Sequence, residues 1–159
     1  MEESGSKWQK VEAVAMFKGT FYHTIDPKGR LIIPAKYREA LGETFVVTKG
    51  LDGCLFVYAN DEWEAFEEKL RQLPLLDKSA RMYKRYFLAG ASDVELDKQG
   101  RILLPASLRE AAKIDKDVVL AGVGNHIEIW SKEAWSEVEA IEEDIEGMEE
   151  KMMSMGLLI

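Results

Sequence analysis

The sequence predicts an α+β fold with a mainly β core that is assembled from two copies of one unit. The first observation is an internal repeat: residues 26–40 align with residues 97–111, and eight of the fifteen aligned positions are identical. The second observation is that, in both copies, short aliphatic and aromatic runs alternate with short helical patterns and with turns that contain glycine. Self-similarity at a fixed offset is typical of a duplicated structural unit.

The repeat covers most of residues 16–135. Its offset is 71 residues in the first half of each copy, where Gly19 matches Gly90. A one-residue insertion raises the offset to 72 further along the chain, where Trp63 matches Trp135. We therefore expect the two copies to form the same elements in the same order.

Each copy opens with a short strand, an Asp-x-x-Gly-Arg turn, an aliphatic strand and a short helix. The helix begins at a proline, which is favoured in the first turn because its fixed φ suits a helix. We expect the aliphatic strand of each copy to be buried against the opposite half. In order, the predicted segments are residues 21–25, residues 31–33 and a helix from Pro34 that stops at Gly42, then residues 94–96, residues 102–104 and a helix from Pro105.

Two further strands and an amphipathic helix complete each copy. The strands are predicted at residues 44–48 and 54–58, and again at residues 118–120 and 126–130. Asn60 or Asp61 is expected to cap the first helix and Ser131 the second, whose apolar residues follow heptad spacing from Val138 onward. The predicted apolar faces are Trp63, Phe66, Leu70 and Leu73, and then Trp135, Val138, Ile141, Ile145, Met148, Met152 and Met155. Each face either covers its own copy or joins subunits.

The repeat also divides the chain. Residues 1–15 match nothing in it and are expected to be a disordered arm or an upstream extension. Residues 16–77 form the first copy with its closing helix, residues 78–88 a linking helix, and residues 89–135 the second copy. Residues 136–159 form an acidic C-terminal helix and tail.

The composition is that of an ordinary globular chain, with 47% hydrophobic and 31% charged residues among 159. The one cysteine, Cys54, has no partner for an intramolecular disulfide, and no apolar run approaches the ~20 residues that span a bilayer. These features predict a cytoplasmic protein without a membrane partner. The net charge of −8 is concentrated at one end, because residues 136–159 hold eight acids and one base, which leaves the rest of the chain at −1.

The turn motif is the strongest candidate for a functional site. Asp26 with Gly29, and Asp97 with Gly100, are expected to shape the two turns. A fixed arginine leaving each turn suits a phosphate group or the edge of a guanine. One such turn favours a simple Asp–Arg ion pair, whereas two equivalent turns favour contact with an anion or a nucleic acid. The candidate DNA-binding residues are Lys28, Arg30, Arg38, Lys98, Arg101 and Arg109.

The doubled motif also carries a resemblance. Two tandem Asp-x-x-Gly-Arg-x-x-x-Pro-x-x-x-Arg units, preceded by Met16-Phe17-Lys18-Gly19 and separated by a helix that contains Arg81, resemble the MraZ family, which is related to AbrB-like DNA-binding proteins. The resemblance covers about residues 16–145. It implies a swapped-hairpin β-barrel, ring-like homo-oligomers, and binding to repeated boxes in double-stranded DNA upstream of the division and cell-wall gene cluster.

The resemblance further implies that the basic DNA contacts fall on Lys28, Arg30 and Arg101. Gln99 stands where the first turn has Lys28, so the two halves are expected to contribute unequally. We thus predict a sequence-specific transcriptional regulator of the nucleoid, without enzymatic activity, metal or cofactor. The alternative is an antitoxin-like or scaffold protein that binds a partner through its acidic C-terminal helix.

Overall fold

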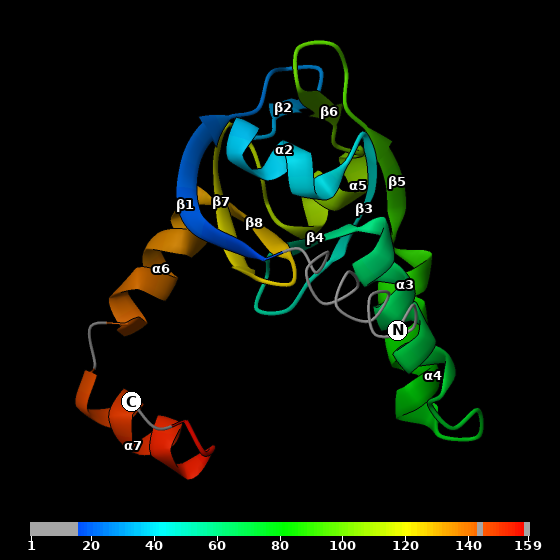
Figure 1. Cartoon of the computed structure of the whole chain (residues 1–159), viewed down its shortest axis with the longest axis vertical. Coiled ribbons are helices and arrows are strands. Elements are labelled where there is room, and N and C mark those ends of the chain that lie inside the picture. Colours follow the sequence, from blue (N-terminus) through cyan, green and yellow to red (C-terminus); the bar gives the residue numbers. More distant parts are fainter. Residues whose placement is uncertain (1–15, 143–144, 158–159) are drawn as a thin grey trace, which may run out of the picture.

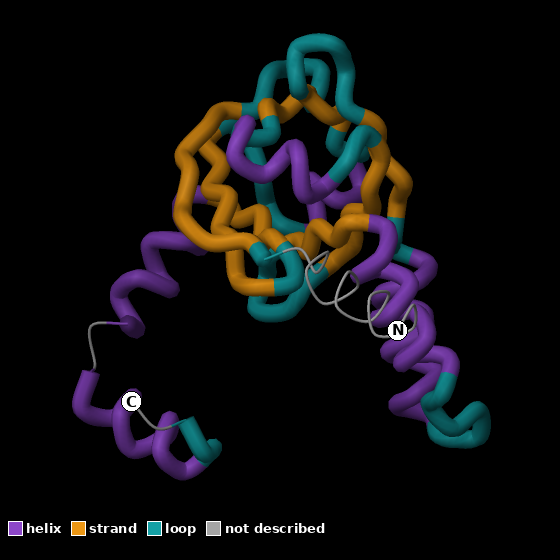
Figure 2. The backbone as a smooth tube through the Cα atoms, in the orientation of Figure 1, coloured by secondary structure: helices purple, strands orange, loops and turns teal. Residues whose placement is uncertain are grey.

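Antiparallel strands dominate the computed structural model, which describes residues 16–142 and 145–157. Six strands form one sheet in the order β1-β7-β8-β4-β3-β5, and two short strands, β2 and β6, form a separate ladder. Figure 2 shows the strands curving around the two short helices between them. The strands are β1 (Phe17–Thr24), β2 (Arg30–Ile32), β3 (Thr44–Lys49), β4 (Leu55–Ala59), β5 (Ser92–Glu95), β6 (Arg101–Leu103), β7 (Asp117–Gly124) and β8 (Ile127–Ser131).

The two copies exchange their first strands. In the first copy β1 pairs along its whole length with β7 of the second copy, and β5 of the second copy pairs with β3 of the first. At the centre of the sheet, β4 pairs with its counterpart β8. The strand order is therefore the same from either edge, which confirms an α+β duplication in which the copies interlock.

The β2–β6 ladder joins the copies at the end of the molecule opposite the arm formed by helices α3 (Asn60–Arg71) and α4 (Lys78–Lys84) (Figure 1). Leu31 lies directly opposite Ile102, its own repeat equivalent, and the pairs on either side are Arg30 with Leu103 and Ile32 with Arg101. Two more backbone bonds flank the ladder: Ile33 N–H donates to Gly100 O at 2.9 Å, and Leu104 N–H donates to Gly29 O at 2.8 Å. The two copies are thus related by a local twofold axis that passes between Leu31 and Ile102.

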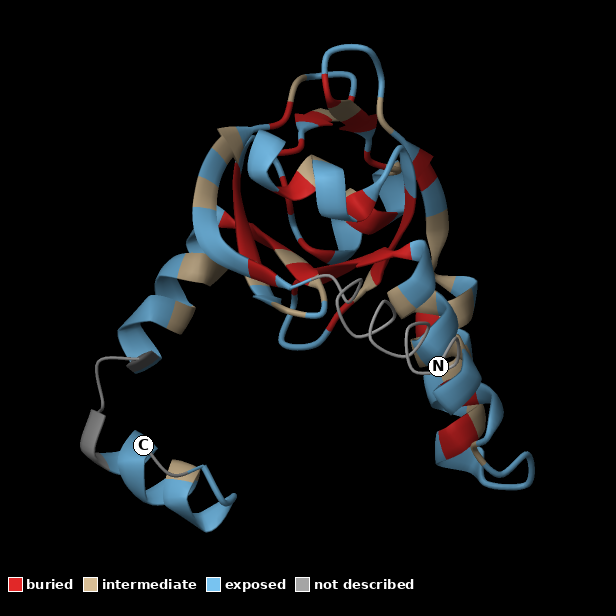
Figure 3. Cartoon of the chain, viewed as in Figure 1, coloured by how far each residue is buried: buried red, intermediate tan, exposed pale blue. Residues whose placement is uncertain are grey.

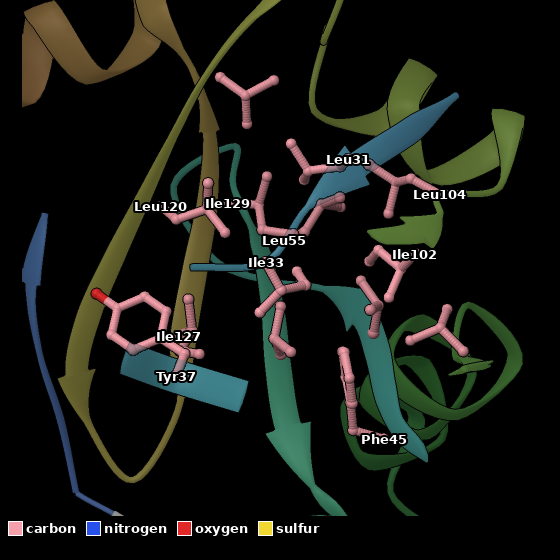
Figure 4. Packing of buried hydrophobic residues seen from close by; sticks show 14 of the residues in the cluster. Leu31, Ile33, Tyr37, Phe45, Leu55, Ile102, Leu104, Leu120, Ile127 and Ile129 are labelled. Atoms are coloured by element: carbon pink, nitrogen blue, oxygen red, sulfur yellow. The ribbon is translucent and has the colours of Figure 1, made fainter. Parts of the chain in front are cut away.

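The main core lies beneath this ladder. Leu31, Ile33, Ile102 and Leu104 are buried together with aliphatic residues of the large sheet and Tyr37 (Figure 4). The expectation that the aliphatic triplets are buried against the opposite half is correct for these four residues only. Period-two alternation turns the middle residues outward, so Ile32 is 40% exposed and Leu103 is 61% exposed.

Most predicted helices are present. Pro34 and Pro105 precede α2 and α5 as their N-cap residues, Gly42 ends α2, and Ser131 Oγ accepts a bond from Ala134 N–H at the start of α6. The helical segments are α2 (Ala35–Leu41), α3 (Asn60–Arg71), α4 (Lys78–Lys84), a turn of π-helix η1 (Arg85–Ala89), α5 (Ala106–Ala111), α6 (Lys132–Glu142) and α7 (Ile145–Ser154).

The predicted cap of α3 is wrong. Ala59 is the N-cap residue and makes no side-chain cap bond. The Asn60 side chain instead donates to Thr44 O at 3.1 Å, which ties the helix to the neighbouring strand β3. Tertiary contact with β3 therefore replaces the local cap that the sequence favours.

The apolar face of α3 covers its own chain. Leu70 is buried, and Trp63, Phe66 and Leu73 pack partly buried on a second cluster that includes Tyr58 and Phe87. Figure 3 shows that most of the surface of α3 and α4 is exposed. This face is an intramolecular contact.

The C-terminal seam is described in two pieces. Val138 packs against the second cluster, whereas Ile141 is 75% exposed. Residues 143–144, which the predicted heptad seam crosses, lie outside the described residues, as do residues 1–15 and 158–159. In the described part of the chain, no helix combines the length and apolar character needed to cross a membrane.

Candidate nucleic-acid interface

The Asp-x-x-Gly-Arg segments form two near-identical turns at the same end of the molecule, beside the β2–β6 ladder (Figure 1). In the first turn, Gly29 N–H donates to Asp26 O at 2.9 Å and Asp26 N–H to Arg30 O at 3.0 Å. Asp26 Oδ1 accepts the backbone N–H groups of Lys28, at 3.0 Å, and of Arg30, at 2.8 Å. The aspartate thus organises the turn from inside, as the sequence predicts.

The second turn repeats this pattern. Asp97 Oδ1 accepts the backbone N–H groups of Gln99 and Arg101, both at 2.9 Å. Gly100 N–H donates to Asp97 O at 3.0 Å. The duplication in sequence is therefore a duplication of geometry, down to individual hydrogen bonds.

Each turn also contains the ion pair that the sequence left open as an alternative. Arg30 Nε lies 2.6 Å from Asp26 Oδ2, and Arg101 Nε lies 2.8 Å from Asp97 Oδ2. Backbone N–H donors and the arginine together hold the pKa of both aspartates below the ordinary value. Both carboxylates therefore remain charged and keep the arginines in place at neutral pH.

The ion pair engages only part of each arginine and leaves its Nη groups available for another contact. It engages only Nε, and within residues 16–142 and 145–157 no hydrogen bond involves the Nη groups of Arg30 or Arg101. Their side chains are 36% and 25% exposed. A guanidinium held by Nε with its two Nη groups available is pre-organised to bind a phosphate or the acceptor edge of guanine.

The helix arginines cross to the opposite copy. A Cβ added at Gly29 would lie 3.0 Å from Cζ of Arg109, and one added at Gly100 would overlap the guanidinium of Arg38. Gly29 and Gly100 have φ of 89° and 77°, so each turn requires glycine for its backbone as well as for this close approach. Each turn is thus completed by an arginine from the other half of the chain.

Arg38 and Arg109 are also anchored on their own copy. Arg38 Nε donates to Ile33 O at 2.7 Å, and Arg109 Nε donates to Leu104 O at 3.1 Å. Both side chains are half-buried. Their position beneath the turns suits a supporting role and leaves Lys28 and Lys98, both exposed, as the outermost predicted cations.

The outer face of the ladder contains two residues that sequence reasoning missed. Because Leu31 and Ile102 point into the core, Arg30, Ile32, Arg101 and Leu103 share the outer face. The sequence predicts Ile32 and Leu103 in the core with their neighbours, whereas both side chains are exposed. The alternation of a half-buried strand was the available signal, but three consecutive aliphatic residues obscured it.

The remaining reactive side chains lie elsewhere. Cys54 is buried, and desolvation raises the pKa of its thiol, which makes it unreactive. His126 packs against Phe56 and Tyr58, with ring centroids 4.5 and 5.2 Å apart. The register of β4 against β8 places Cys54 and His126 near opposite ends of the paired strands.

Comparison with known proteins identifies the duplication. The family model described as "MraZ protein, putative antitoxin-like" matches twice, over residues 16–86 and 87–155. The chain belongs to the MraZ family. The resemblance inferred from the doubled turn motif is therefore confirmed, including its two repeats.

Curated MraZ relatives match most of the chain. The Transcriptional regulator MraZ of Caldanaerobacter subterraneus subsp. tengcongensis is 64% identical over 122 residues, which cover 77% of this chain and 85% of that protein. The protein of the same name from Desulfitobacterium hafniense is 60% identical over 129 residues, 81% of this chain and 90% of the relative. That of Clostridium beijerinckii is 53% identical over 142 residues, 89% of this chain and all of the relative. These names support a DNA-binding regulator rather than an enzyme.

Proposed function

We propose that this MraZ protein is a sequence-specific transcriptional regulator that binds double-stranded DNA through the end of the molecule formed by its two turns. The observation that carries the proposal is the repetition of one arginine geometry. Arg30 and Arg101 are each fixed by an aspartate through Nε, keep their Nη groups available, and share one two-stranded ladder. A β-ribbon of this kind can enter the major groove, where arginine pairs with the O6/N7 edge of guanine.

The other cations have distinct parts in the proposal. Lys28 and Lys98, exposed on the turns, contact phosphates and position the ladder on the duplex. Arg38 and Arg109 add positive charge from beneath and hold the opposite turn. Asp26, Gly29, Asp97 and Gly100 shape the turns. Because Gln99 replaces the lysine of the first turn, the two half-sites are read with unequal strength.

The proposal extends to fold type and target on the strength of the family. Exchange of β1 and β5 between the copies supports a swapped-hairpin β-barrel of the AbrB type. Family resemblance implies repeated boxes in the promoter of the division and cell-wall gene cluster, and with them a cytoplasmic, nucleoid-associated protein.

Ring-like self-association is part of the same proposal. The segment from α4 to η1 contains the cations Lys78, Arg81, Lys84 and Arg85 and no acid, whereas α6 and α7 are acidic. Exposed apolar residues accompany both: Leu75 and Leu76 before α4, and Ile141 in α6. Opposite charge at the two ends supports a head-to-tail contact between copies. Light scattering should give a mass several times 18.0 kDa that falls in Ile141→Asp.

One observation favours a second candidate, an antitoxin-like or scaffold protein. The C-terminal helices α6 and α7 are rich in acidic residues, and Met153 in α7 and Met155 just after it are exposed, on a surface that the sheet does not cover. Such a surface suits a partner protein. The doubled turn geometry, which this role does not require, favours the regulator.

Selection from a random pool of duplex DNA at physiological salt tests the proposal. The intact protein should enrich one short box, and Arg30→Ala combined with Arg101→Ala should abolish the enrichment. Recovery of unenriched DNA by the intact protein would contradict sequence-specific binding and favour the second candidate.

A further inference from the structure

We infer that Ile32 and Leu103 read thymine methyl groups between the two arginines, an inference that rests on the proposed DNA binding. Both side chains are exposed on the outer face of the ladder, although the residues on either side of each in sequence are fully buried. They are repeat equivalents, 71 residues apart. The exposure is thus a property of both copies rather than of one irregular position.

The register places each aliphatic side chain opposite an arginine. Ile32 is paired with Arg101, and Leu103 with Arg30. Directly opposed side chains in an antiparallel pair have Cβ atoms about 5 Å apart. The outer face is therefore a block of two arginine–aliphatic pairs, related by the local twofold relation between the copies.

The block matches the chemistry of the major groove. Guanine presents two acceptors there, which arginine recognises, and thymine presents a C5-methyl group, which binds apolar side chains. Along each strand, Arg30 and Ile32, or Arg101 and Leu103, are two residues and so about 7 Å apart, close to two base-pair steps of DNA. The flanking cations Lys28 and Lys98 suit the phosphates on either side. The occupant that fits this face is duplex DNA containing guanine and thymine.

The simpler alternative is that isoleucine and leucine occupy the ladder only because they stabilise strands. Scattered apolar residues are normal on protein surfaces. The two alternatives predict different results when the thymine methyl group is removed. If the two residues only stabilise the strands, the affinity for DNA does not depend on that methyl group.

Replacement of thymine by deoxyuridine makes the test, because it removes the methyl group and keeps the base pair. The probe is the box selected from the random pool, prepared with thymine or with uracil throughout. The intact protein should bind the uracil duplex about 4-fold more weakly for each methyl group in contact, since each buried carbon contributes about 0.8 kcal/mol. Ile32→Ala combined with Leu103→Ala should bind the thymine duplex more weakly and bind both duplexes equally.

Controls assign the effect to these residues. Leu51→Ala removes an exposed leucine from the turn between β3 and β4, so it should discriminate as the intact protein does. Ile32→Ala and Leu103→Ala are then tested separately on boxes that contain uracil in only one half. Each single variant should lose its sensitivity to the methyl groups of a different half of the box. Because any change in DNA shape is the same for every variant, loss of discrimination in Ile32→Ala/Leu103→Ala alone isolates the methyl contact.

Three results overturn the inference while leaving the proposed function intact: a selected box without thymine, equal binding of thymine and uracil duplexes by the intact protein, or unchanged discrimination in the double variant. Failure of the intact protein to bind any duplex would instead overturn the proposed function, and the inference with it.

Discussion

At the residue scale, the contact between Gly100 and Arg38 links the two halves of the site. Gly100→Ala introduces a Cβ at a φ of 77° and against the guanidinium of Arg38. We expect a loss of stability of about 1–3 kcal/mol. Gly29→Ala carries a similar backbone strain but should cost less, because its Cβ would lie 3.0 Å from the Arg109 guanidinium carbon instead of overlapping it.

A double-mutant cycle makes this prediction specific. Part of the Gly100→Ala penalty should vanish when Arg38→Ala is also present, because the overlapping group is then absent. Arg109→Ala, the equivalent substitution on the other helix, lies against Gly29 and should be additive with Gly100→Ala. Unfolding free energies from denaturant titration give the two coupling terms. Equal coupling in both cycles would contradict the crossed arrangement.

A second residue-scale prediction concerns His126. Burial lowers the pKa of this imidazole below its ordinary value of 6.5, and Nδ1 lies 2.8 Å from Oδ1 of Asn125. The native state therefore disfavours protonation, whereas the unfolded chain takes up a proton near pH 6.5. Stability should accordingly fall as pH decreases below about 6.5.

The measurement is the midpoint temperature of thermal unfolding as the pH is lowered from about 7.5 to about 5, a range that spans the ordinary pKa of an imidazole. His126→Phe should flatten the decline, because an aromatic ring without a titrating group then packs against Phe56 and Tyr58. His23→Gln, which removes the other histidine, should retain it. A decline of the same size in His126→Phe would show that other groups cause it.

At the element scale, the strand exchange determines which segments can fold alone. Residues 16–77 lack the partner of every strand that reaches the second copy: β7 for β1, β6 for β2, β5 for β3 and β8 for β4. We expect this fragment to remain unfolded or to form a homodimer in which Leu31 pairs with Leu31 of the second molecule. Sedimentation with circular dichroism distinguishes these states from a folded monomer, which would contradict the interlocked arrangement.

The elements also show how much of the fold can be predicted from the sequence. The order of strands and helices, the two turns and the ends of α2 follow from local signals such as Pro34, Gly42 and the Asp-x-x-Gly-Arg motif. The exposure of Ile32 and Leu103 and the crossing of Arg38 to Gly100 do not, because they depend on which copy each strand pairs with. The predicted cap of α3 is wrong for the same reason, because the Asn60 side chain donates its hydrogen bond to Thr44 on a neighbouring strand.

At the scale of the whole molecule, charge is separated along the chain. The cationic turns and ladder lie at one end of the sheet, and residues 136–159 hold a net charge of −7. An acidic protein can therefore present a cationic face to DNA, although the chain as a whole carries −8. Net charge alone would have excluded the proposed function, whereas its distribution supports it.

The measurement that tests the central claim most directly is the salt dependence of binding to the selected box. Arg30→Ala/Arg101→Ala should lower the affinity at least about tenfold. The salt slope should fall by roughly one unit for each arginine that contacts phosphate, and stay unchanged where the arginine contacts a base.

The matched control is Lys69→Ala/Arg71→Ala, which removes the same charge. Both residues lie in the last turn of α3, where Arg71 is paired with Glu68, away from the DNA-binding turns and from the cationic segment of α4 and η1. This variant should bind like the intact protein. Equal affinities for the intact protein and Arg30→Ala/Arg101→Ala, or equal losses in the two double variants, would contradict the assignment of the two turns as the DNA-binding face.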